Sequence, residues 1–147
     1  MQFKLLAENQ FERFDRPYIP VWVNTQVFEE WWSKDLDYFA PDYHTELNSS
    51  YFARIDRAPS FCIGRGSLSI KCGVDCFYFS GGRHRTRWII SLGVDPLPVA
   101  ILPSDVARAR EIGLLIRFIE GGESVELPVT IEEIEQEAAE FEQYLMS

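Results

Sequence analysis

The chain has 147 residues, of which 46% are hydrophobic and 14% aromatic, and its formal net charge at pH 7 is −9. This length and apolar content suffice for one domain with a full core, and no apolar run approaches the roughly 20 residues that span a bilayer. The acidic balance argues against a general binder of duplex DNA, because such proteins are basic as a rule. We therefore expect a single domain over residues 1–147 without a transmembrane segment.

The negative charge is concentrated at the C-terminal end of the sequence. Residues 1–119 contain 14 basic and 14 acidic residues, whereas residues 120–147 contain nine glutamates and no lysine or arginine. Such an asymmetry is typical of a surface that meets a partner or of a solvated helix face.

The first half of the chain shows an extended segment at 18–23 and a helical pattern at 26–39. Aromatic and aliphatic residues recur there at helical spacing, and we expect the pair Trp31-Trp32 to belong to the core. Residues 42–60 are ambiguous, although residues 48–50 suit the cap of a short helix over 51–55. Strands at 67–72 and 74–79 then form a hairpin around Gly73.

The second half alternates helices and strands. A helix over about 84–92 precedes a buried strand at 98–102, and Ser104 caps a helix over roughly 105–119 that ends before two glycines. Residues 130–133 form a capping box for a last, acidic helix over about 131–145. This order predicts an α/β (α+β) fold with a small mixed sheet flanked by helices.

The three cysteines are Cys62, Cys72 and Cys76. An odd number suits a reduced cytosol better than a disulfide framework. A zinc site would need a histidine or carboxylate beside Cys72 and Cys76. Alternation with Leu68 and Ile70 instead places Cys72 on the inner face of a strand, so we expect no metal site.

The most informative stretch is residues 81–88, where Gly81 and Gly82 follow an apolar strand and three arginines and a histidine follow within five residues. Glycines let the backbone approach a ligand, and the first turn of a helix suits an anion. Cations are unfavourable against the helix dipole there, which indicates an anionic guest. An exposed helix start that is merely solvated is the competing interpretation.

A family resemblance follows from this stretch. A strand, Gly-Gly-Arg-His-Arg, a short helix ending in Gly93 and then Pro-Leu-Pro-Val-Ala resemble the central signature of the ParB/sulfiredoxin superfamily. More closely, residues 79–88 resemble the plasmid fertility inhibition factors of the Osa/FiwA type. The likeness covers about residues 74–102. It implies a ParB/sulfiredoxin-like fold and a His84-Arg85 pair that contacts nucleotide.

Two departures limit what the resemblance carries. Arg83 stands where sulfiredoxins have a nucleophilic cysteine, so reduction of sulfinic acid is not expected. The ParB partition proteins add a DNA-reading domain and a dimerisation domain, for which 147 residues leave no room. The resemblance therefore implies a minimal nucleotide-binding core.

The residues of this stretch suggest specific roles. Arg83 and Arg87 are four residues apart on one helical face, and we expect them to clamp a phosphate that the backbone at Gly81 and Gly82 cradles. His84 is the group that transfers a proton near neutral pH, with Asp75 as a candidate carboxylate partner. Arg85 completes the phosphate-binding set. The resemblance implies ATP with a divalent metal such as Mg²⁺ as the ligand.

Two functions remain open at this stage. The first is inhibition of conjugative transfer, in which the protein blocks a type IV secretion coupling protein or the transferred nucleoprotein from the cytoplasmic face of the inner membrane. The second is a small ATPase or DNase that acts on nucleotide or DNA. The resemblance implies both, and an acidic C-terminal docking surface would serve the first.

Overall fold

The computed structural model describes residues 1–6, 18–42, 53–54, 59–71 and 73–146. Within them the chain forms helices and short strands that belong to two mixed sheets, so the α+β class is confirmed. The elements are β1 (Gln2–Leu6), β2 (Ile19–Val23), α1 (Thr25–Trp32), β3 (Ala53–Arg54), β4 (Ser60–Cys62), β5 (Gly64–Lys71), β6 (Val74–Gly81), α3 (Arg83–Ser91), β7 (Leu97–Ile101), the 3-10 turn η2 (Pro103–Asp105), α4 (Val106–Glu111), β8 (Leu115–Phe118), β9 (Ser124–Glu126) and α5 (Ile131–Met146).

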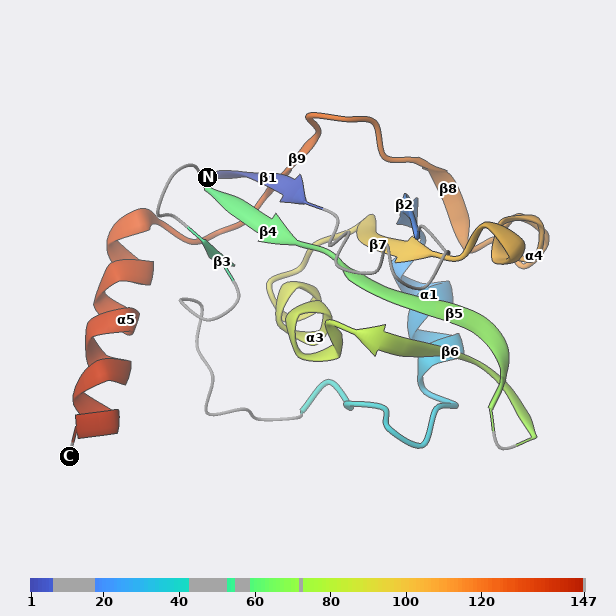
Figure 1. Cartoon of the computed structure of the whole chain (residues 1–147), viewed down its shortest axis with the longest axis horizontal. Helices are drawn as coiled ribbons and strands as arrows, with labels where there is room; N and C mark the ends of the chain where they lie inside the picture. The colour runs from blue at the N-terminus through green and yellow to red at the C-terminus, as the bar shows by residue number, and fades with distance from the viewer. Residues whose placement is uncertain (7–17, 43–52, 55–58, 72, 147) are drawn as a thin grey trace.

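The larger sheet has the strand order β6-β5-β7-β2-β8, and the smaller sheet has the order β3-β4-β1-β9. β5 pairs parallel with β7 and antiparallel with β6, while β1 pairs parallel with β4. β4 and β5 are separated only by Ile63, so one extended stretch of chain contributes to both sheets (Figure 1).

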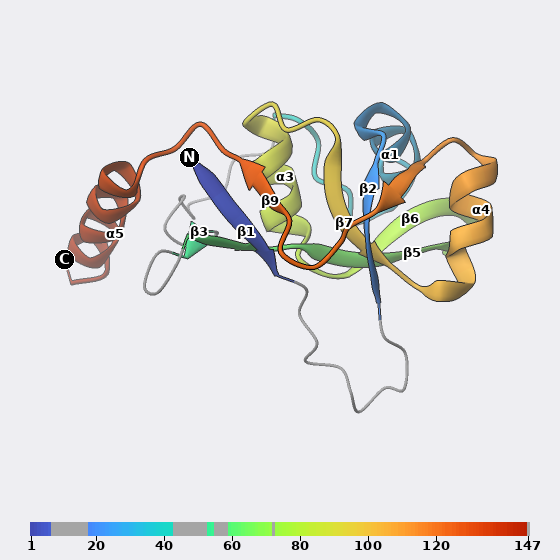
Figure 2. The ribbon, with the colours of Figure 1, turned by 90° about the horizontal axis from the view of Figure 1, so that it is seen from above.

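Helices α4 and α5 lie at opposite ends of the molecule, and α3 lies between them beside β5 (Figure 2). None of the helices in the described part of the chain has the length and apolar character that crossing a bilayer requires.

The core is aromatic where α1 covers β6. Phe28 and Trp32 of α1 are fully buried, and the ring of Phe28 lies 4.8 Å from that of Phe77. Trp32 packs 5.0 Å from Phe79, edge to face. The expectation that Trp31-Trp32 is core holds for Trp32, while Trp31 is only partly buried. Aromatic pairs of this kind stabilise a core beyond the area that they bury.

Several predicted elements are confirmed. The hairpin turns at Gly73, the strands at 76–79 and 98–102 match β6 and β7, and the helix at 84–92 matches α3. The amide of Glu133 donates to Thr130 Oγ1 at 3.1 Å, as a capping box requires, and α5 follows. The short helix expected at 51–55 is wrong where the structure describes it, because Ala53–Arg54 form strand β3; the rest of that range lies outside the described residues.

The helix predicted over 105–119 is wrong in its second half. α4 ends at Glu111, Gly113 has φ of +75°, and residues 115–118 form β8 instead. This segment pairs antiparallel with β2, a contact that no local pattern reveals. The predicted cap at Ser104 is wrong too, since the residue lies inside the 3-10 turn η2.

One helix boundary and the exposure of one strand residue also differ from the expectations. The helix expected over 26–39 ends at Trp32, and the chain then turns, with the Asp35 amide donating to the Trp32 carbonyl at 2.9 Å. Ile70 was expected on the inner face of its strand, yet it is 67% exposed because the hairpin tip extends past the core. Cys72 lies outside the described residues, whereas Cys76 is a buried free thiol.

Candidate functional site

Gly81 and Gly82 form the closely packed junction between β6 and α3. Gly82 is the N-cap of α3 with φ of +86°, a backbone conformation that favours glycine. A Cβ atom at this position would lie 2.6 Å from Gly64 Cα in the neighbouring strand, and one at Gly81 would lie 2.6 Å from Arg65 Nη2. Gly82 is therefore required by both its backbone conformation and the close packing of this junction, whereas a side chain at Gly81 would have to displace the end of the Arg65 side chain.

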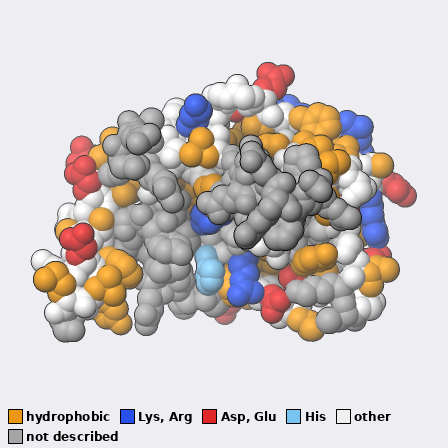
Figure 3. All heavy atoms as spheres, in the orientation of Figure 1, with side chains coloured by type: hydrophobic (Ala, Val, Ile, Leu, Met, Phe, Trp, Pro, Cys, Tyr) orange, Lys and Arg blue, Asp and Glu red, His pale blue; other side chains and the backbone are white. Residues whose placement is uncertain are grey.

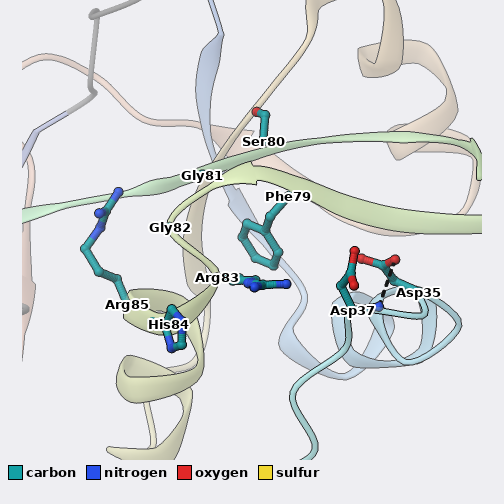
Figure 4. A pocket seen from close by; sticks show the side chains of 9 residues that line it. All are labelled: Asp35, Asp37, Phe79, Ser80, Gly81, Gly82, Arg83, His84 and Arg85. Carbon is teal, nitrogen blue, oxygen red and sulfur yellow. Dashed lines mark hydrogen bonds between the residues drawn. The ribbon is translucent and has the colours of Figure 1, made fainter. Parts of the chain in front are cut away.

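A pocket of about 420 Å³ opens beside this junction. Figure 4 shows that its side chains come from the end of β6, the start of α3 and the turn after α1. Figure 3 shows a histidine side chain beside basic side chains on the same face of the molecule. The lining residues are Asp35, Asp37, Phe79, Ser80, Gly81, Gly82, Arg83, His84 and Arg85.

The two arginines of the pocket point in different directions. The guanidinium of Arg83 lies 4.7 Å from the centre of the Phe39 ring and extends toward the side where Asp37 lies (Figure 4). Arg85 extends to the other side of the helix start, where its Nε donates to the Cys62 carbonyl at 2.9 Å. The pocket thus has a cation on each side of the N-terminus of α3.

His84 packs its ring 4.6 Å from the ring of Phe39. Burial, and next the neighbouring charge of Arg83, lower the pKa of His84 below its usual value. The imidazole is therefore neutral at neutral pH, so it has one nitrogen that donates and one that accepts a hydrogen bond or a proton.

Two carboxylates that sequence reasoning missed line the opposite wall. Asp35 is buried, and its Oδ1 accepts from the amide of Asp37 at 3.3 Å. Both were hidden because the helix was expected to continue through residue 39. The polar run at residues 33–35, directly after the two tryptophans, was the signal for an earlier helix end.

Arg65 is a second feature that the sequence did not reveal. It lies between two glycines at the start of β5, a short pattern that alone does not indicate a strand. Its side chain is only 8% exposed and lies directly under Gly81. A third guanidinium therefore stands behind the glycine backbone of the pocket.

The remaining predicted site residues are not in the pocket. Arg87 turns away from it, and its guanidinium contacts Glu29 and the Phe39 carbonyl. Asp75 lies at the other end of the eight-residue β6, roughly 20 Å from Gly81 along an extended strand, and pairs with Arg108 at 2.8 Å. The structure thus brings together five of the expected residues, Gly81, Gly82, Arg83, His84 and Arg85, but neither Arg87 nor Asp75.

The chain was also compared with known proteins. It matches no protein-family model, no curated protein and no solved structure at a significant level. Among the described residues, no three His, Cys, Asp or Glu side chains gather in a way that would hold a metal ion.

Proposed function

We propose that the protein binds a nucleoside triphosphate, as its Mg²⁺ complex, in the pocket at the N-terminus of α3. The observation that carries this proposal is the pocket itself, which combines Gly81, Gly82 and the side chain of Arg83 at a helix start. The N-cap is a glycine and offers no side chain to the first turn, so the backbone N–H groups there are suited to phosphate oxygens.

The carboxylates across the pocket favour the metal complex over the bare anion. Asp35 and Asp37 would repel a triphosphate, since His84 is neutral and the arginines offset only part of the combined negative charge. Mg²⁺ prefers oxygen ligands and binds through one or two carboxylates together with substrate phosphates. A cation between these aspartates and the phosphates removes the repulsion.

For the biological role we propose fertility inhibition. The support is the resemblance of residues 74–102 to the Osa/FiwA type of plasmid fertility inhibition factor. In this account the ligand-bound protein blocks a type IV secretion coupling protein or the transferred nucleoprotein. The acidic helix α5, at the other end of the molecule from α4, is the surface that docks onto the partner.

A hydrolytic enzyme is the second candidate, and one observation favours it. The pocket holds a neutral imidazole and two carboxylates within one cavity, which are the groups that water activation beside a metal needs. Asp35 and Asp37 replace Asp75 as the candidate carboxylates. Release of phosphate from ATP, or cleavage of DNA, by the purified protein would support this function.

The binding proposal is tested by calorimetry with ATP and Mg²⁺. Arg83→Ala should weaken binding by at least about tenfold, because charge-assisted hydrogen bonds contribute about 1.5–3 kcal/mol each. Arg110→Ala is the matched control, since Arg110 is an exposed arginine on α4 that stacks on Phe118 at the far end of the molecule. Absence of heat from the wild-type protein would overturn the proposal.

The biological role is tested separately in mating experiments. Donor bacteria that express the wild-type protein should transfer a co-resident conjugative plasmid less often than donors with an empty vector. Donors that express Arg83→Ala should regain transfer if nucleotide binding is required. Unchanged transfer with the wild-type protein would contradict fertility inhibition and leave the binding proposal standing.

A further inference from the structure

Arg87 is buried in a cluster that joins three parts of the chain. The residue is 5% exposed, and its Nε donates to the Phe39 carbonyl at 2.7 Å. Nη2 donates to Glu29 Oε2 at 3.0 Å, and Nη1 lies 2.5 Å from Glu29 Oε1. All three guanidinium nitrogens are thus engaged within the protein, so a phosphate would have to displace a carboxylate to reach them.

Aromatic rings also pack against the guanidinium of Arg87. Its carbon lies 4.7 Å from the centre of the Trp32 ring and 5.3 Å from that of Tyr38. Tyr38 also donates its hydroxyl to Glu29 Oε2 at 2.7 Å. Burial, together with this hydrogen bond and the charge of Glu29, raises the pKa of Tyr38, so the hydroxyl remains a donor.

These contacts bear on the pocket because they hold one of its walls. Residues 35–39 supply the pocket carboxylates, and Phe39 packs against both Arg83 and His84. The turn bonds of this segment join it to itself and to the end of α1, as with Tyr38 N to the Asp35 carbonyl at 3.1 Å and Asp35 N to the Trp32 carbonyl at 2.9 Å. Arg87 connects the segment to α3, one helical turn after Arg83.

We propose that Arg87 is a positioning residue for the nucleotide pocket. Together with Glu29 it fixes residues 35–39 against α3, and thereby sets the separation of the carboxylate wall from Arg83 and the orientation of Arg83 over Phe39. Ligand affinity depends on Arg87 through these groups and without contact between Arg87 and the ligand. This inference rests on the proposed function for its ligand.

The discriminating variant is Glu29→Gln, which leaves every lining residue of the pocket and Arg87 itself in place. A positioning role predicts weaker binding of ATP with Mg²⁺, because the neutral amide no longer anchors the guanidinium. A direct phosphate-binding role for Arg87 predicts the opposite, equal or tighter binding, because the guanidinium is released from its carboxylate. Weaker binding of ATP by Glu29→Gln therefore supports the positioning role, and equal or tighter binding supports direct contact between Arg87 and phosphate.

A double-mutant cycle adds a second measurement. Arg87→Lys keeps the charge and loses the planar, bidentate contact, and it should weaken binding by about tenfold, within the range of coupling between residues of one network. Combined with Arg83→Ala it should cost little beyond Arg83→Ala alone, since Arg87 acts through Arg83 and its wall. Binding that is unchanged in folded Arg87→Lys, or additive losses, would overturn the proposal.

Amide hydrogen exchange of the ligand-free protein tests the wall directly. The amides of residues 35–39 should exchange faster in Glu29→Gln and in Arg87→Lys than in the wild type, while those of α4 stay unchanged. Unchanged exchange at residues 35–39 would overturn the positioning role. If the wild type binds no ATP, the proposed function fails, and this exchange measurement still decides whether Arg87 holds the wall.

Discussion

The pocket and the C-terminal helix differ in how their charges are held. Near the pocket, arginine side chains are held within the protein: Arg83 stacks on Phe39, and the buried Arg87 beside the pocket stacks on Trp32 and pairs with the partly buried Glu29. On α5, five of the six glutamates are exposed and Glu137 is partly buried, and the last turn contains only exposed residues. This difference agrees with our proposals that the pocket binds a small anionic ligand and that α5 associates with a larger partner.

The apolar residues of α5 are buried near the start of the helix and exposed near its end. Ile134 is 2% exposed near the start of the helix, while Leu145 is 66% exposed near its end. Between them, Ala138 and Phe141 are partly buried. The apolar residues Ile134, Ala138, Phe141 and Leu145 thus form one stripe, and its last part lies on the surface together with Tyr144 and Met146, which are 63% and 88% exposed.

The largest expected effect is on the anchored start of α5. Ile134→Ala should destabilise the protein by about 2–4 kcal/mol, because it removes a buried side chain. Leu145→Ala is the matched change at the exposed end and should stay within about 0.5 kcal/mol of the wild type. Urea unfolding measures both. Equal losses would show that the stripe is packed along its whole length.

Replacing three glycines by alanine, one at a time, tests the packing of the junction between β6 and α3. Gly82→Ala should cost about 2–4 kcal/mol, since it combines a positive φ with a clash against Gly64. Gly122→Ala carries only the positive φ, and Gly121→Ala carries neither, so their losses should fall in that order. Thermal unfolding gives the ranking, and a Gly82→Ala protein as stable as Gly121→Ala would contradict the packing described at the junction.

Charge reversal tests the assignment of α5 to docking. Glu135→Lys with Glu142→Lys changes two exposed positions off the apolar stripe, and we expect it to relieve inhibition of plasmid transfer and leave ATP binding and stability unchanged. Glu30→Lys with Glu111→Lys is a control with the same change of charge elsewhere on the surface. If both pairs act alike in mating assays, net charge rather than α5 is responsible.

The smallest expected effect is the pH dependence of binding. The pKa of His84 is lowered in the free protein, and a bound phosphate would favour the charged imidazole and raise it. Binding therefore takes up a proton, and affinity should rise a few-fold as pH falls from about 8 to 6. In His84→Asn the remaining pH dependence should be that of ATP alone. An identical profile in wild type and variant would exclude His84 from the site.

Short sequence patterns predicted the glycine junction of the candidate site. The positions of other side chains, such as Arg87, depend on contacts between residues that lie far apart in the sequence. The junction at Gly81 and Gly82 was predictable because glycines between an apolar strand and a helix indicate a tight turn or a close approach of the backbone. The true role of Arg87 was not, since its partners Glu29 and Phe39 lie 58 and 48 residues away. Helical spacing showed that Arg83 and Arg87 share one face of α3. It did not show that Arg83 lines the pocket while Arg87, one turn later, is buried in the protein.

The same limit applies to the strand β8 and to Asp75. Residues 115–118 form a strand because β2 offers them an edge, and no pattern within the segment distinguishes this from a continued helix. Asp75 lies near the start of the strand that leads to the glycines, and its spacing in the sequence does not reveal its distance from them. An extended strand carries it to the opposite end of β6, where it meets Arg108.

The central claim, that this pocket binds nucleotide, is tested most directly by a titration with ATP and Mg²⁺ followed by amide chemical shifts. The account predicts saturable shifts at Gly81–Arg85 and at Asp35–Asp37, the two walls of the pocket, and none in α4 or β8. No saturable shifts, or shifts confined to another part of the molecule, would contradict it.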